Sequence, residues 1–225
     1  MNLKYQTGFG NEFAVALIKT ATSIFVVILS LFVQVQSQSP ASKSVRDEEY
    51  RVYDAVIRHM FRDGVTQFDM NAKVSQIVIR DRTMSKYAWS AQKENWEQVK
   101  IRLKSLSDET ISGYETVRQS EIDLKPNLVT PPKFVLVGDT QLKKMFSNPN
   151  EYDRTTEQWE EFYKIFPNSA GVNTFSRVGF DKSNRNALVY FVNWCGPLCG
   201  TGTYLHVEKR ENGWVVKQAG GMWIS

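Results

Sequence analysis

The hydrophobic pattern of this chain changes its period near residue 171. Before that point apolar residues recur every three or four positions, which predicts amphipathic helices over 44–62 and 87–106 and a further helix that begins after Ser107. Short β-branched runs at 73–80 and 134–138 predict two strands among these helices.

The clearest helix signal covers residues 155–166. Thr155 and Gln158 form a capping box, and Pro167 ends the segment. Aromatic residues then fall on one helical face, at Trp159, Phe162, Tyr163 and Phe166.

After residue 171 the alternation of apolar and polar residues predicts strands. They are expected at 172–180, 187–194, 203–210 and 214–217, and 223–225 could pair as well. Asn212–Gly213 has the chemistry of a tight hairpin turn. Because 187–194 is apolar on both alternations, it predicts a central strand covered by helices on at least one side. The expected fold class is α+β, with N-terminal helices followed by a curved antiparallel meander of four to five strands.

An uncharged apolar run covers residues 20–33 and ends in small and polar residues. Its length is typical of a signal peptide, with Val35 and Ser37 at the positions that signal peptidase reads before a cut preceding Gln38. The alternative is an uncleaved anchor over 14–35, about 22 residues, which is enough for a tilted membrane span. A buried helix of a cytosolic domain is a third interpretation.

These patterns predict how the chain is organised. We expect a signal peptide or anchor at 1–37, a polar linker at 38–44 and a single α+β domain at 45–225. Within that domain the helical part would cover 45–170 and the meander 171–225. Both leading interpretations of the N-terminus place the domain beyond a membrane, so we expect a periplasmic or secreted protein. Membrane contact is expected only through an uncleaved N-terminal segment.

Composition narrows the possible partners. The formal net charge is only +4 and the charges are interspersed, so no basic stripe indicates nucleic-acid binding. With 42% hydrophobic and 12% aromatic residues, the chain has enough apolar surface for a substantial core.

The two cysteines, Cys195 and Cys199, lie in one short segment around Gly196 and Pro197. In an oxidising compartment such a pair forms a disulfide, which here would fix the turn between two strands. A redox pair normally has two intervening residues at a helix N-terminus, whereas this pair has three in a β context.

The main alternative to a purely structural disulfide involves His206. On the strand after the cysteines it could join Cys195 and Cys199 as a zinc or copper ligand, or serve as the base for a nucleophile. The plainer interpretation is a partly exposed strand histidine with no such role. Arg177 could meet an anionic ligand, pair with a carboxylate such as Glu208, or reach solvent. The candidate ligand-binding residues are therefore Arg177, His206, Trp194 and Tyr204. We assign no catalytic residue, metal site or cofactor.

The C-terminal block contains the segments FPNSAG, SRVGF and CGPLCG, followed by GWVV. It resembles a group of exported bacterial proteins with no assigned activity. The resemblance covers roughly the last 60 residues and implies export and a strand-rich end. We expect a non-enzymatic module that binds a small ligand, an envelope component or a partner protein. The alternative is an exported hydrolase or metal-binding protein that uses His206 near the Cys195/Cys199 loop.

Overall fold

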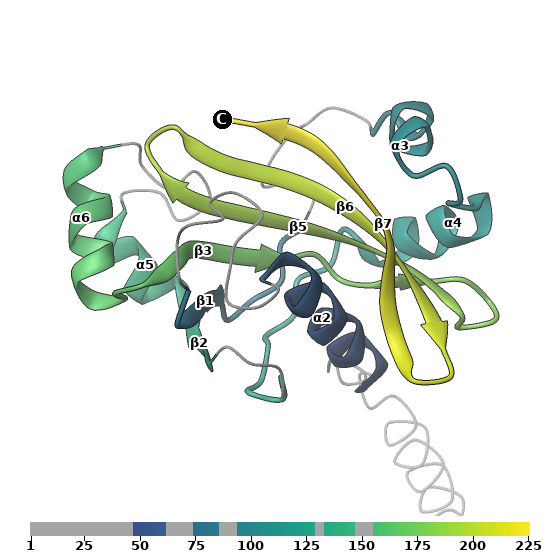
Figure 1. Ribbon diagram of the computed structural model, residues 1–225, viewed down its shortest axis with the longest axis horizontal. Coiled ribbons are helices and arrows are strands. Elements are labelled where there is room, and N and C mark those ends of the chain that lie inside the picture. Colours follow the sequence, from purple (N-terminus) through teal and green to yellow (C-terminus); the bar gives the residue numbers. More distant parts are fainter. Residues whose placement is uncertain (1–46, 62–73, 86–93, 129–132, 147–154) are drawn as a thin grey trace, which may run out of the picture. The chain divides into compact units, whose positions relative to one another are not determined.

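A single mixed sheet organises the part of the chain that the computed structural model describes, residues 47–61, 74–85, 94–128, 133–146 and 155–225 (Figure 1). The helices in this part are α2 (Asp47–Met60), α3 (Trp96–Arg102), α4 (Asp108–Val117), α5 (Asp139–Met145) and α6 (Thr156–Ile165). The strands are β1 (Gln76–Arg80), β2 (Lys133–Val137), β3 (Ser169–Phe175), β4 (Gly179–Phe180), β5 (Asn186–Gly196), β6 (Cys199–Arg210) and β7 (Gly213–Ile224). The α+β class is therefore confirmed.

The strand order is β2-β1-β3-β5-β6-β7, with β4 beside β5. β3, β5, β6 and β7 pair antiparallel, as expected, and β6 and β7 are twelve residues long. The expectation of a purely antiparallel meander after the helices was incomplete, because β1 pairs parallel with both β2 and β3. Parallel neighbours need long crossover connections, and α3 to α6 lie within those connections.

Both faces of the central strand β5 are buried, as its sequence predicted. Val189 and Phe191 pack with Tyr53 and Ile57 of α2 on one face of the sheet. The other face carries two aromatic-rich clusters. One, against α5 and α6, contains Val192 and Trp194, and the other, against α3 and α4, contains Leu188 and Tyr204. Helices thus cover the sheet on both sides, as Figure 1 shows.

Local sequence signals predicted the bounds of most helices and strands to within a few residues. The helix predicted at 155–166 is Thr156–Ile165, and the Thr155 side chain accepts a hydrogen bond from the Gln158 backbone N–H. The predicted strand 172–180 is instead two strands, because the chain leaves the ladder at Ser176–Val178 to contact α2. The predicted helix 87–106 is helical only at Trp96–Arg102 among the described residues.

The predicted signal peptide or anchor and the linker lie outside the described residues. Ser44–Ser225 forms one compact unit. Among the described residues, no helix has the length and apolar character needed to cross a bilayer.

Candidate functional site

The disulfide Cys195–Cys199 closes the turn between β5 and β6, as the sequence predicted. The two Cα atoms are 5.0 Å apart, and neither cysteine is free. The Tyr163 hydroxyl of α6 donates a hydrogen bond of 2.9 Å to the Cys195 carbonyl oxygen. With both sulfurs bonded, neither is available as a metal ligand or a nucleophile.

His206 lies far from this turn. The expectation that it is partly exposed was wrong, because the side chain is only 1% exposed. It is seven residues from Cys199 along β6, which corresponds to about 23 Å at the rise of a strand. The fold does not bring the predicted His206–cysteine cluster together. Across the described ranges, no three histidine, cysteine or acidic side chains are grouped so as to hold a metal ion.

Polar groups surround the His206 ring instead. Its Nδ1 lies 3.0 Å from the Ser105 hydroxyl, and its Nε2 lies 3.1 Å from Oδ1 of Asn186. Asn186 donates through Nδ2 to the Asp181 carboxylate, which leaves its Oδ1 as the acceptor facing His206. This network favours a proton on Nε2 in the neutral ring, and Nδ1 then competes with Gln218 Oε1, 2.6 Å from the Ser105 oxygen, for the single Ser105 hydroxyl proton. Burial and the Lys217 ammonium lower the pKa of His206.

Arg177 pairs with a carboxylate, but the partner is Glu49 of α2 and not Glu208. Its Nε and Nη2 donate to the two Glu49 oxygens at 2.9 and 2.8 Å. Glu208 pairs with Lys217 and Arg210. Arg177 lies between β3 and β4, outside a strand, and links that segment to α2.

Trp194 and Tyr204 are buried among aromatic rings. The Trp194 and Trp223 ring centroids are 5.0 Å apart, and those of Tyr204 and Tyr190 are 4.5 Å apart. Burial raises the pKa of Tyr204 strongly. Trp194 and Tyr204 belong to one aromatic network, because Trp223 Nε1 donates a hydrogen bond of 2.7 Å to the Tyr190 hydroxyl. Arg177 and His206 belong to other hydrogen-bond networks, and the four candidate binding residues line no common cleft in the described structure.

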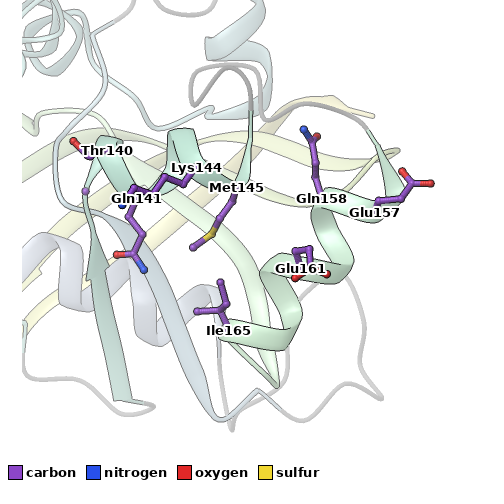
Figure 2. Close-up of a pocket in the computed structure, with 9 residues that line it drawn as sticks. Thr140, Gln141, Lys144, Met145, Glu157, Gln158, Glu161 and Ile165 are labelled. Atoms are coloured by element: carbon purple, nitrogen blue, oxygen red, sulfur yellow. The ribbon is translucent and has the colours of Figure 1, made fainter.

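A cleft between α5 and α6 offers a different site (Figure 2). Its volume is about 900 Å³. The lining residues are Gly138, Thr140, Gln141, Lys144 and Met145 on the α5 side and Glu157, Gln158, Glu161 and Ile165 on α6. In Figure 2 Met145 and Ile165 approach each other from the two helices and form an apolar floor.

The cleft floor rests on a packed core. Leu142, Phe146 and Phe162 are fully buried directly behind it. Arg80 of β1 anchors the start of α5 through two hydrogen bonds to Asp139, at 2.5 and 2.8 Å. The Arg80 hydrogen bond lowers the pKa of Asp139. Both helices that line the cleft are therefore attached to the rest of the domain, α5 through Arg80 of β1 and both helices through this core.

Some side chains of the cleft can form hydrogen bonds or ion pairs that no described residue supplies. The buried Oε1 of Gln158 has no hydrogen-bond partner in the described structure. Glu161 pairs with Lys164 at 2.5 Å, and Lys144 makes no ion pair with a described residue. Ile165 is 52% exposed although it is a large apolar side chain.

A second, smaller cleft of about 550 Å³ lies on the other side of α6. It is lined by Trp159, Glu160, Tyr163 and Lys164 of α6, by Thr156 at the start of that helix, and by Cys195, Gly196 and Pro197 of the disulfide turn. The helix α6 therefore forms a wall between two clefts.

The sequence held one signal for the larger cleft. Ile165 falls off the aromatic stripe of 155–166, so an apolar side chain was left on the polar face. The α5 side gave no signal, because a helix of seven residues is too short for a periodic pattern.

A scan against protein-family models and searches of curated proteins and solved structures found no match. The resemblance of the C-terminal block to exported proteins therefore stays a prediction.

Proposed function

We propose that this chain is an exported, non-enzymatic binding module and that the α5–α6 cleft receives its ligand. The observation that carries the proposal is the combination of an apolar floor, a charged rim and a volume of about 900 Å³. Ligand pockets typically have volumes of about 300–1,000 Å³, with mainly apolar walls and a few polar groups that orient the ligand.

Binding explains this cleft better than catalysis does. Among the described residues that line it there is no histidine and no cysteine. Its polar lining includes one lysine, two glutamates and three neutral hydrogen-bonding residues, which suit recognition of a charged or hydrogen-bonding group; they are Lys144, Glu157, Glu161, Thr140, Gln141 and Gln158.

Export rests on the apolar N-terminal run and agrees with the disulfide, since disulfides persist in oxidising compartments. N-terminal sequencing of the protein recovered from the periplasm or medium tests this part. The expected first residue is Gln38, or Met1 in a membrane fraction if the segment is an anchor. Soluble, unprocessed protein in the cytoplasm would contradict export.

Binding at the cleft is tested by methyl NMR of the purified protein with N-acetyl-L-leucinamide, a neutral apolar probe. The probe should shift the methyl signals of Met145 and Ile165. The Ile165→Asp variant should lose binding, because a carboxylate replaces half of the apolar floor. Ile101→Asp is the matched control, since Ile101 is 72% exposed on α3 and does not line the cleft. Unchanged signals at both cleft methyls, with this probe and with its charged leucine analogues, would overturn the assignment.

A second candidate function is acyl hydrolysis at Ser105, and the Ser105–His206–Asn186 network favours it. The exposed Ser105 hydroxyl would pass its proton to His206 Nδ1 as its Oγ bonds to an ester carbonyl carbon. The ester C–O bond would then break, and the leaving alcohol would take the proton. Water would release the acid from the acyl-serine.

We place this candidate second because Gln218 competes for the Ser105 hydroxyl. Gln218 Oε1 lies only 2.6 Å from Ser105 Oγ and also accepts the Ser105 backbone N–H. A fluorophosphonate probe with peptide mass spectrometry is the test. Covalent labelling of Ser105 that disappears in His206→Gln would establish the enzyme. Labelling no faster than that of exposed Ser183 would remove this candidate.

A further inference from the structure

We infer that the α5–α6 cleft selects a zwitterionic ligand with an aliphatic body, an amino acid or a short peptide. This inference rests on the proposed function, since it names the ligand class of the same cleft. The argument uses the charges on the two walls, the hydrogen-bonding group without a partner, and the shape of the floor.

The two walls carry complementary charges. Lys144 lies on α5, while Glu161 lies on α6, and no ion pair joins them in the described structure. Axes of packed helices are about 8–10 Å apart, so side chains on separate helices leave a gap at the rim of a cleft. A ligand with one positive and one negative group can satisfy both walls at once.

The α6 wall accepts hydrogen bonds. Gln158 Oε1 lacks a donor in the described structure, and buried polar atoms of native proteins nearly always have a partner. Glu161 contacts Lys164 through Oε1, so its second oxygen has remaining acceptor capacity. An ammonium group brings three N–H donors, of which one can bind the second Glu161 oxygen; the buried Gln158 Oε1 is reached only after the Gln158 amide turns towards the ligand.

The α5 wall offers the opposite chemistry. Lys144 is exposed and provides up to three donors for a carboxylate. Gln141 and Thr140 line the same side and add neutral hydrogen-bonding groups. Figure 2 shows these three side chains on α5, across the cleft from α6.

The floor selects an aliphatic body. Met145 is half-buried and unbranched, and methionine adapts to ligands of different shape. With Ile165 it forms a surface suited to a leucine-like side chain. An extended chain advances roughly 3.3–3.6 Å per residue, so the end groups of a dipeptide can reach both walls better than those of a single amino acid.

The test compares five probes by NMR titration of the Met145 and Ile165 methyls. Leucyl-leucine and leucine carry both charges, leucinamide only the positive one, N-acetyl-leucine only the negative one, and N-acetyl-leucinamide neither. Two partly exposed charge contacts predict that leucyl-leucine binds roughly five- to tenfold more tightly than the neutral probe. If leucine binds as tightly as leucyl-leucine, the ligand class is a free amino acid. If the dipeptide binds more tightly, the ligand class is a short peptide.

Charge variants assign each wall. Lys144→Met should remove the preference for leucyl-leucine over leucinamide, whereas Lys143→Met, a neighbouring lysine that does not line the cleft, should keep it. Glu161→Gln should remove the preference over N-acetyl-leucine, and Glu160→Gln, which lines the second cleft, should keep it. Equal binding of all five probes would overturn this inference while the proposed function stands. A complete lack of binding would overturn both.

Discussion

The Arg177 guanidinium forms two parallel hydrogen bonds with the Glu49 carboxylate, and Glu49 is fully buried. The two residues are 128 positions apart in the sequence. This ion pair ties the segment between β3 and β4 to α2.

Replacing Glu49 with Ala should lower the free energy of unfolding by about 3 kcal/mol, because removing one partner leaves a largely buried charge uncompensated. Urea denaturation measures the effect. The double variant Glu49→Met with Arg177→Met should be more stable than the single variant, since it removes both charges. A double variant less stable than Glu49→Ala would show that the hydrogen bonds themselves stabilise the fold more than this account allows.

Gly200 and Gly202 of β6 lie directly against aromatic side chains, which leave no room for a Cβ atom. A Cβ atom at Gly202 would lie 2.0 Å from the Tyr190 hydroxyl and 2.1 Å from Trp223 Nε1. Gly202→Ala should therefore cost about 1–3 kcal/mol through overpacking. Gly221→Ala is the control, because no atom lies within 4 Å of the Cβ position there. Thermal melts of the two variants give the comparison, and equal melting temperatures would contradict this explanation.

The sequence predicted those elements whose signals are local. The Thr155 cap and the alternation in β5 to β7 act between near neighbours, so they are readable without the fold. The parallel position of β1 was not readable, because a short run such as Ile77–Ile79 fits a parallel or an antiparallel neighbour equally well.

The candidate site was harder to predict than the fold. Arg177 was expected to meet a ligand or a carboxylate, but only the tertiary structure brings Glu49 to it. The α5–α6 cleft forms between two helices joined by an unpatterned segment, and the sequence separates Lys144 from Glu161 by 17 positions. Sites made from such distant residues need the three-dimensional arrangement before they can be recognised.

His206 should make stability depend on pH. Its folded-state pKa is lowered, first by burial, while the unfolded value is about 6.5. The unfolded chain therefore binds this proton more readily, so stability is greatest above about pH 6.5 and decreases as the pH falls towards the folded-state pKa.

The His206→Gln variant isolates this effect, since glutamine keeps a donor for Asn186 and an acceptor for Ser105 without titrating. Between about pH 7.5 and pH 5.5 the melting temperature of the natural protein should fall more than that of the variant. His59 is the other histidine and is unchanged in both proteins. Parallel curves would show that His206 keeps its ordinary affinity for protons.

The disulfide should contribute modestly to stability, because it closes a short loop. Replacing both Cys195 and Cys199 with Ser should lower the free energy of unfolding by about 2 kcal/mol in the chain-entropy model and leave the fold intact. Circular dichroism and urea denaturation provide the measurement, with the reduced natural protein as the matched comparison. Complete unfolding of the variant would mean that the β5–β6 turn is required for assembly of the sheet.

The most direct test of the central claim is an intermolecular NOE experiment with leucyl-leucine and the methyl-labelled protein. A ligand seated between α5 and α6 should give NOEs from its leucine methyls to Met145 and Ile165, and these should disappear in Ile165→Asp but persist in Ile101→Asp. NOEs confined to residues outside the cleft, such as Leu198 at the disulfide turn, would contradict the assignment of this cleft as the binding site.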